Sequence, residues 1–315
     1  MRIDHAPASV TYSPTLGLRP GGSRPLRSQS SLELWAYRLY DRWLRPGRAG
    51  SDPLFCFKRG LHRALSAIGA QRFKRTLADR PVLYDNHRIR IDPQDTLRVL
   101  SGRPIDPAEM ALLASHLGAG GIAVDIGANI GLYTLAMARQ VGPHGRVFAF
   151  EPAPGNFALL TQNVESNGYS AIVTASRTAI ADRSGFARFA LNAHNAGMHR
   201  LAPDGAVEVE TARLDDLLAG QRVDFVKIDV EGAEVAVLRG MQTIIAANPG
   251  IALLVEYNEA GLRAFHHSTN DLFAELEGFT FTVAGKMGAA SRADLAAATR
   301  GDGAYANLLF KRRHP

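Results

Sequence analysis

The sequence of 315 residues contains one cysteine, Cys56. A single cysteine excludes a disulfide within the chain and any metal site built from clustered cysteines, and it fits a reducing compartment. The sequence also lacks any apolar run of about 18 residues, so it predicts no membrane-spanning helix. No apolar signal core stands near the N-terminus, and we therefore expect a cytoplasmic protein.

Acidic residues are scarce in the first 80 positions. That part holds 15 Lys and Arg against 5 Asp and Glu, whereas the remainder holds 21 against 25. The sequence pI of about 9.7 therefore reflects the N-terminal part and not the rest of the chain. A basic arm can bind nucleic acid, an anionic membrane surface or a protein partner, but a solvated tail is the simpler interpretation and the one we favour.

Composition divides the chain into three parts. Residues 1–30 are rich in Pro, Gly, Ser and Arg and predict a disordered arm. Residues 31–80 predict a basic helical extension, which we expect to dock onto the body or onto a second copy in a homodimer rather than onto a membrane. Its apolar stripe has helical spacing and consists of Leu32, Trp35, Leu39 and Trp43. Residues 81–315 predict one large α/β domain.

Strand-like and helix-like segments alternate within residues 81–315. We expect an edge strand at 82–92 and a helix at 106–117, with Asp106 as its N-cap. The main strands are expected at 121–127, 145–152, 171–180, 223–230 and 251–258. The helices between and after them are expected at 129–142, 154–168, 233–248 and 268–279, with extra strands at 185–192 and 206–212 and a closing pair at 280–285 and 305–313. Strand–helix units in series predict a doubly wound, largely parallel sheet.

The junction "VDIGANIG" joins the first main strand to its helix and lacks the glycines of a dinucleotide fingerprint. A G-x-G-x-x-G pattern that starts at Gly127 would need glycine where Asn129 and Leu132 stand, which disfavours a nucleotide-dependent dehydrogenase. The glycines that are present, Gly127 and Gly131, still let a ligand approach the backbone, and the helix N-terminus offers free N–H groups.

Glu151 closes the next strand, 20 residues after Gly131. That spacing suits a carboxylate that accepts hydrogen bonds from both hydroxyls of an adenosine ribose. The glycine turn and the acid together predict a nucleoside-binding site, against the alternative of a purely structural turn.

Several segments in order resemble one family. "DIGANIGLYT", "GRVFAFEPAPGNFALLTQNVESNG", "LDDLL" and "VDFVKIDVEGAEVAVLRGM" resemble the FkbM-type S-adenosylmethionine-dependent methyltransferases, and "NLLFKR" looks like the end of that domain. The resemblance covers about residues 82–312. It implies a seven-stranded class I methyltransferase sheet, Rossmann-like with an antiparallel last hairpin, and S-adenosyl-L-methionine as the cofactor.

The resemblance also implies cofactor contacts. It places Asp125, Gly127 and Asn129 beside the methionyl part and Glu151 at the ribose. Asp182, in "AIADRSG", is the candidate partner for the exocyclic amine of adenine. The alternative for Asp182 is an ordinary turn residue, because Asp is common in turns.

Charged residues interrupt a strand that should be apolar. A central parallel strand is buried on both faces, yet "FVKIDVEGAE" carries Lys227, Asp229 and Glu231 at a period of two. Burying such groups costs roughly several kcal/mol each unless they are paired. They either form an internal ion pair or line a cleft at the carboxyl end of the strand. Their expected place beside the methyl donor favours the cleft.

These residues are the candidates for catalysis. We expect Asp229 to orient or deprotonate an acceptor hydroxyl, with Glu231 as the second candidate and Lys227 holding Asp229 ionised. Glu256, which ends the neighbouring strand, is placed to join this acidic group. Paired carboxylates can hold a divalent cation, but no histidine is interleaved at ligand spacing, so we assign no metal ligand.

Two histidines stand in the excursion before the fourth main strand, in "LNAHNAGMHRL". A histidine here could act as a base, and the segment is placed to cover the acceptor. The alternatives are that His194 and His199 are loop histidines without a role, or that "GMHRL" only shapes the acceptor pocket. We name His199 as the catalytic candidate.

These patterns predict a methyltransferase that O-methylates a hydroxyl of a sugar or secondary metabolite, a small-molecule acceptor. A nucleic-acid-directed methyltransferase that uses the basic arm is disfavoured, because the body is acidic and lacks an Asn/Asp-Pro-Pro-Tyr loop for a flipped base. We therefore expect no nucleic-acid partner. A non-catalytic cofactor-binding or scaffold protein is disfavoured by the intact glycine turn, by Glu151 and by the acids that follow Lys227.

Overall fold

The structure is a computed structural model and describes residues 80–102, 104–192, 196–286, 288–300 and 304–312. The predicted disordered arm at 1–30 lies outside the described residues, and so does the predicted helical extension at 31–80 except for Arg80. Within the described ranges, none of the helices has the length and apolar content needed to cross a membrane.

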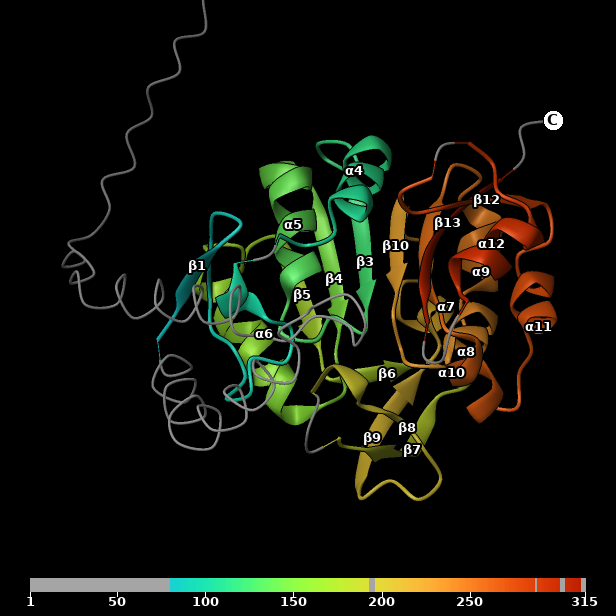
Figure 1. Cartoon of the computed structure of the whole chain (residues 1–315). Coiled ribbons are helices and arrows are strands. Elements are labelled where there is room, and N and C mark those ends of the chain that lie inside the picture. The colour runs from blue at the N-terminus through green and yellow to red at the C-terminus, as the bar shows by residue number, and fades with distance from the viewer. Residues whose placement is uncertain (1–79, 103, 193–195, 287, 301–303, 313–315) are drawn as a thin grey trace, which may run out of the picture.

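A seven-stranded sheet forms the centre of the described chain, with the strand order β12-β13-β11-β10-β3-β4-β5 (Figure 1). Every neighbouring pair is parallel except those of β13, which runs antiparallel to both β11 and β12. This confirms the predicted doubly wound sheet and its antiparallel last hairpin. The strands are β3 (Ile122–Ile126), β4 (Arg146–Phe150), β5 (Val173–Ser176), β10 (Phe225–Ile228), β11 (Ala252–Tyr257), β12 (Phe279–Val283) and β13 (Ala306–Arg312).

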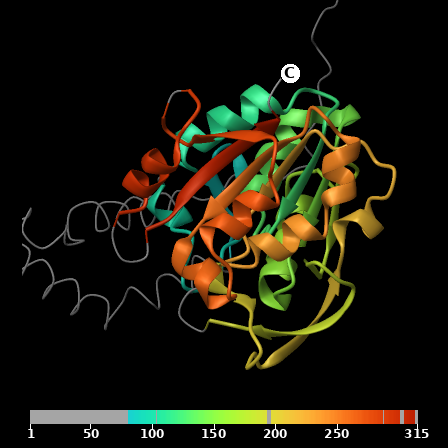
Figure 2. The ribbon, with the colours of Figure 1, turned by 90° about the vertical axis from the view of Figure 1, so that its right-hand side faces the viewer.

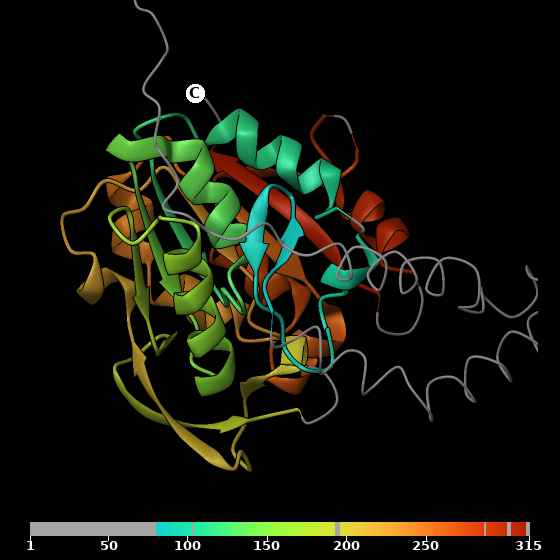
Figure 3. The ribbon, with the colours of Figure 1, turned by 90° about the vertical axis from the view of Figure 1, so that its left-hand side faces the viewer.

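Helices cover both faces of this sheet, and an apolar cluster lies under each layer. One layer, which faces the viewer in Figure 3, consists of α4 (Pro107–His116), α5 (Leu132–Val141) and α6 (Pro154–Ser166). The other, seen in Figure 2, consists of α7 (Leu214–Leu217), α8 (Glu234–Arg239), α9 (Gln242–Ala247), α10 (Glu259–Ala264), α11 (Thr269–Ala274) and α12 (Arg292–Ala298). Strand β10 shows the expected alternation of side chains between the two faces of the sheet. Phe225 packs in the apolar cluster under α4, α5 and α6, whereas Val226 and Ile228 pack in the cluster under the opposite helix layer.

The segment predicted as one edge strand at 82–92 is instead a separate hairpin. Its strands β1 (Val82–Tyr84) and β2 (His87–Ile89) pair with each other, outside the large sheet. Asp85 and Asn86 both have positive φ, 47° and 63°, as the two central residues of a tight I′ hairpin turn require. The chain after β2 donates a backbone N–H to Oδ1 of Asn163 on α6 at 2.7 Å, which holds the hairpin on that helix layer.

The segment predicted as a third main strand at 171–180 divides between two sheets. Only β5 belongs to the large sheet, and β6 (Thr178–Ile180) leaves it to join a four-stranded sheet of order β6-β9-β7-β8. The other strands of this small sheet are β7 (Gly185–Ala190), β8 (Arg200–Leu201) and β9 (Val207–Ala212). The predicted local excursion is therefore confirmed, and Figure 1 shows the small sheet below the large one.

One predicted helix, at 233–248, is two helices, because α8 ends at Arg239 and α9 begins at Gln242. Gly240 lies between them and packs against the chain that follows β6. A Cβ at Gly240 would stand 2.0 Å from the carbonyl oxygen of Ala181. Short 3-10 helices occur at η2 (Val99–Ser101), η3 (Gly142–His144) and η4 (Ala196–Met198).

Candidate active site

A cavity of about 580 Å³ opens where β3, β4, β10 and β11 end. Ligands in doubly wound sheets bind at this end, near the reversal in strand order, which here lies between β3 and β10. The small sheet adds Phe189 and Leu201 to the wall. Most of the predicted site residues line this cavity: Asp125, Gly127, Asn129, Glu151, His199, Lys227, Asp229 and Glu231. Gly131 and Asp182 do not.

Asp125 presents an unsatisfied acceptor to the cavity. Its side chain is fully buried on β3, and Oδ2 accepts a hydrogen bond from Oγ1 of Thr134 at 2.6 Å. Oδ1 is buried and has no hydrogen-bond partner in the part of the chain that the structure describes. Burial raises the pKa of Asp125, against the opposing charge of Lys227. Such an atom is able to accept a hydrogen bond from a bound molecule.

Two glycines of the turn, Gly127 and Gly131, stand where another segment of the chain passes too close for a side chain. Gly127 has φ of 83°, and a Cβ there would stand 1.8 Å from the carbonyl oxygen of Asp229. Gly131 has φ of 95°, and its Cβ would stand 2.7 Å from Cδ1 of Leu160 on α6. Gly127 therefore lets two strand ends pass, and Gly131 lets two helices pack. The left-handed residue between them, Asn129 with φ of 51°, turns its backbone N–H toward the next strand.

Glu151 is fixed by backbone donors at the end of β4. Its Oε2 accepts from the N–H of Asn129 and its Oε1 from that of Ala153, both at 2.8 Å. A carboxylate has about four acceptor positions, so about two remain for a ligand. Burial raises the pKa of Glu151 to about 7, and the two N–H bonds oppose that shift. The orientation of the carboxylate is therefore fixed, and its remaining acceptor positions can take hydrogen bonds from hydroxyl groups of a ligand.

Asp182 lies away from the cavity. Its side chain is exposed, and its backbone oxygen accepts from Nη1 of Arg213 at 3.2 Å. The residues after β5 that do line the cavity are those of β6: Thr178, Ala179 and Ile180. This placement gives no support to a contact between Asp182 and adenine, which stays a prediction from the resemblance.

Lys227 forms the ion pair that the sequence allowed and also faces the cavity. Its Nζ donates to Oδ2 of Asp229 at 2.7 Å and lies 4.4 Å from the centre of the Tyr133 ring. Only 3% of the residue is exposed. Burial lowers the pKa of Lys227, but the charges of Asp229 and Asp125 outweigh it and raise the pKa above its usual value. The two interpretations of the charged residues in this strand, an internal ion pair and the lining of a cleft, are therefore both correct for Lys227 and Asp229.

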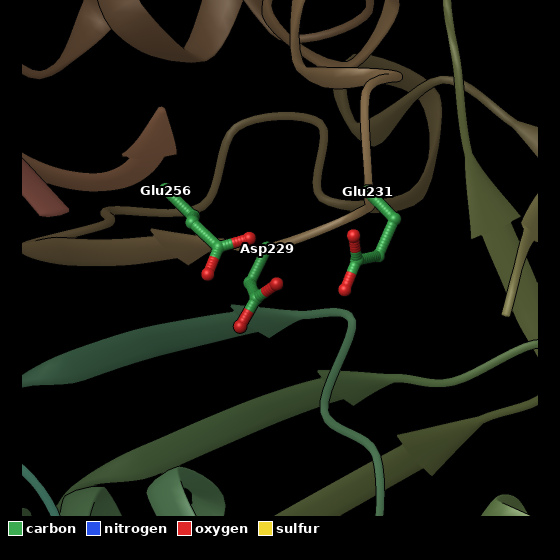
Figure 4. A group of neighbouring side chains, drawn as sticks. All are labelled: Asp229, Glu231 and Glu256. Atoms are coloured by element: carbon green, nitrogen blue, oxygen red, sulfur yellow. The ribbon is translucent and has the colours of Figure 1, made fainter. Parts of the chain in front are cut away.

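Three carboxylates gather at the ends of β10 and β11 (Figure 4). Oxygens of Asp229, Glu231 and Glu256 lie within 4.8 Å of one another, so Glu256 does join the group as expected. Glu231 reaches it through a turn with φ of 55° and not through strand alternation, because β10 ends at Ile228. Burial, followed by the charge of Asp229, raises the pKa of Glu231 to about 7 and raises that of Glu256 as well.

Such a group could hold a divalent cation, because carboxylate oxygens are the ligands that Mg²⁺ and Ca²⁺ prefer. Acidic groups are nevertheless common in proteins without an ion. Lys227 already supplies a positive charge to Asp229. The carboxylates alone therefore do not assign a metal centre.

His199 faces the cavity as a neutral ring. Its Nδ1 accepts from the backbone N–H of Asn192 at 2.9 Å, which places the proton of the neutral ring on Nε2. Burial lowers the pKa of His199. The ring packs edge-on against Phe189 with 6.3 Å between centroids. His194 lies outside the described residues.

The sequence patterns missed a second polar network on the same wall. Tyr133 on α5 donates its hydroxyl to Oε2 of Glu109 on α4, and Nδ2 of Asn307 on β13 donates to Oε1 of Glu109 at 2.6 Å. Asn307 is also the cross-strand partner of Glu256. Glu109 lies in the first turn of a capped helix, where an acid is favoured by the helix dipole alone. No local pattern therefore marked it as part of a site.

Comparisons with known proteins show which family the chain resembles. The family model described as "Methyltransferase FkbM domain" matches residues 125–283. The methyltransferase sdnD of Sordaria araneosa is 31% identical over 154 residues, which are 38% of this chain and 59% of that protein. The hexuronic acid methyltransferase AglP of Haloferax volcanii is 34% identical over 121 residues, which are 37% of this chain and 48% of that protein.

The chain thus spans about half to three-fifths of the length of these curated relatives. Among solved structures, a SAM-dependent O-methyltransferase from Thermotoga maritima aligns with a TM-score of 0.40 and 14% identity. That alignment covers 70% of this chain and 72% of the other.

Proposed function

The chain belongs to the FkbM methyltransferase domain family, and from that membership we propose that it transfers a methyl group from S-adenosylmethionine to a hydroxyl oxygen of a small-molecule acceptor. One observation carries the proposal. A single cavity joins the glycine turn and Glu151 at one end to the carboxylates of Asp229, Glu231 and Glu256 at the other. This arrangement would put a donor site and a base for an acceptor hydroxyl within one cavity.

The residues at the first end fit the cofactor. The free acceptor positions of Glu151 suit the two ribose hydroxyls. The unpartnered Oδ1 of Asp125 suits a cationic donor such as an α-amino group. Held there by Glu151 and Asp125, S-adenosylmethionine would supply the methyl group for transfer to the acceptor oxygen, and S-adenosylhomocysteine would be the leaving group.

The residues at the second end handle the acceptor proton. Asp229 has Oδ2 committed to Lys227, so its fixed carboxylate is suited to orient the hydroxyl. Glu231, with its pKa raised to about 7, is suited to accept the proton near neutral pH. We therefore propose Glu231 as the base and Asp229 as the orienting group, the reverse of their order in the sequence analysis. The neutral ring of His199 shapes the wall beside them.

The acceptor that we propose is a small molecule and not a nucleic acid. Acids outnumber bases on the acceptor wall, where Asp229, Glu231 and Glu256 stand with Lys227. A phosphate backbone needs a basic track and would be repelled here.

Calorimetric titration with S-adenosylmethionine tests the cofactor assignment. We expect micromolar affinity for the purified protein, a loss of at least about tenfold in Glu151→Ala, and no binding of NAD. Glu165→Ala, an exposed acid on α6, is the matched control and should bind like the unchanged protein. A folded protein that does not bind S-adenosylmethionine would refute the proposal. Formation of S-adenosylhomocysteine with hydroxylated acceptors then tests transfer.

A further inference from the structure

The charges on the acceptor side of the cavity limit what the acceptor can be. The acidic residues there, apart from Asp125 and Glu151 at the cofactor side, are Asp106, Glu109, Asp229, Glu231 and Glu256. The basic residues that line the cavity are Lys227 and Arg98. Burial raises the pKa of Glu256 to about 9, so this group keeps its proton near neutral pH. Asp229 and Glu231 still place negative charge beside an acceptor carboxylate, which costs free energy in a partly desolvated site.

Of the two basic residues, Lys227 is committed to Asp229, and Arg98 lies on an exposed part of the wall, where water screens its charge. Lys227 is 3% exposed, is bonded to Asp229 and lies over the Tyr133 ring. Arg98 is an exposed residue of the cavity wall. The charge of Arg200 acts on Glu231, but this residue does not line the cavity. Among the residues that the structure describes, the cavity wall therefore offers a buried acceptor carboxylate no buried cation that is not already paired.

The remaining wall has the features of a site for a sugar ring. Tyr305 is 60% exposed although it lines the cavity, so it offers an aromatic face to a molecule that enters. The apolar C–H face of a pyranose can cover such a ring, and its hydroxyls can reach polar neighbours. Asn307 stands two residues along the chain and is oriented by Glu109. Asn258, which caps α10 through its Oδ1, also lines the cavity.

We propose that the acceptor is a glycoside without negative charge, whose ring stacks on Tyr305 and whose hydroxyls bind the carboxylates around Glu231, and that the cavity discriminates against hexuronates. The inference rests on the proposed methyltransferase function. It sets this chain apart from the relative that is named for a hexuronic acid. An amino group on the sugar would strengthen binding, because it would meet the carboxylates of Asp229 and Glu231.

The test compares three matched acceptors: methyl glucosaminide, methyl glucoside and methyl glucuronide. Formation of S-adenosylhomocysteine is measured with the full chain at about pH 8, where Glu231 is ionised. We expect kcat/KM to be highest for the amino sugar and at least about tenfold lower for the glucuronide than for the neutral glycoside. The same order is expected in EDTA and in Mg²⁺, because the discrimination comes from the protein charges.

Two variants separate the contributions. Because Glu231 is also the proposed base, its charge is tested by binding and not by turnover. In calorimetric titrations with S-adenosylhomocysteine present, Glu231→Gln should raise the glucuronide-to-glucoside ratio of affinities severalfold, whereas Glu277→Gln, an exposed acid outside the cavity wall, should leave it unchanged. Tyr305→Ala should raise KM for the neutral glycoside severalfold with little change in kcat. Tyr305→Phe keeps the ring and should restore the original KM.

Each adverse outcome has a distinct meaning. Equal or better use of the glucuronide, in EDTA or in Mg²⁺, would overturn the charge argument. Binding of S-adenosylmethionine without methylation of any of the three glycosides would overturn the glycoside assignment and leave the methyltransferase proposal standing. Failure to bind S-adenosylmethionine would overturn both.

Discussion

Replacement of Gly127 by alanine is the sharpest test of how the two halves of the cavity are joined. Gly127 follows β3, and the carbonyl of Asp229, which follows β10, occupies the space that a side chain at 127 would need. A Cβ–O separation of 1.8 Å cannot exist, so the two loops must move apart. The turn at Gly127 and the carboxylate of Asp229, which we propose orients the acceptor, would both be displaced.

The free energy of unfolding should fall in two parts. A non-glycine residue at φ of 83° costs about 1–2 kcal/mol, and forcing an extra methyl group into a packed site costs about 1–3 kcal/mol more. We therefore expect Gly127→Ala to lose about 2–5 kcal/mol in urea unfolding, with an unchanged m-value. Affinity for S-adenosylmethionine should fall as well, measured at a temperature where the variant is folded.

Substitutions at two other glycines distinguish the backbone contribution from the steric contribution. Gly120 has φ of 73° with no atom within 4 Å of the place that a Cβ would take, so Gly120→Ala should lose only the backbone part, about 1–2 kcal/mol. Gly155 in α6 has neither a positive φ nor a close neighbour, and Gly155→Ala should be neutral or stabilising by up to about 1 kcal/mol. The reasoning is refuted if Gly127→Ala costs no more than Gly120→Ala.

Three further predictions concern the charged groups. The value of kcat/KM should rise with pH through about 7, because burial raises the pKa of Glu231 to about 7 and the base must be ionised; a flat profile from about pH 6 to 8 would contradict this role. Burial also raises the pKa of Glu234 to about 7, so between about pH 4.5 and 7 the folded state keeps a proton that the unfolded state releases. The free energy of unfolding should therefore fall by up to about 3 kcal/mol as the pH rises through this range. Glu234→Gln should reduce that decline in urea unfolding, and an identical decline in the variant would exclude Glu234 as its source. Lys227→Met should lower the free energy of unfolding by about 2–3 kcal/mol, which is less than the loss of a fully buried ion pair, because the side chain of Asp229 is 33% exposed. Thermal unfolding that matches the original protein would show that the ion pair is dispensable.

Local sequence patterns were sufficient to predict most strands of the central sheet and most of the residues at one end of the cavity. Alternation placed Val226 and Ile228 on one face of β10, and the spacing from Gly131 to Glu151 placed an acid at the end of β4. These features depend on neighbours in sequence. The acids after Lys227 were also visible, because charge is conspicuous in a strand that should be apolar.

The parts that were missed depend on contacts between distant segments. The break between α8 and α9 follows from the passage of the Ala181 carbonyl over Gly240, which no helical pattern contains. The hydrogen bond from Asn307 to Glu109 joins residues 198 positions apart. Gly127 was noticed, but its requirement for a bare backbone comes from Asp229 on another strand. Sequence spacing could identify the glycine without identifying its neighbour.

The position of β13 has a consequence for synthesis on the ribosome. It is the last described strand to emerge, yet it lies between β11 and β12, which precede it. Strand β12 can therefore find its place in the sheet only when β13 arrives, and β11 keeps an open edge until then. The nascent chain could assemble the turn at Gly127 and the carboxylate of Glu151 well before Asn307 closes the acceptor wall. If the proposed roles hold, the part of the cavity assigned to the methyl donor would thus form before the part assigned to the acceptor.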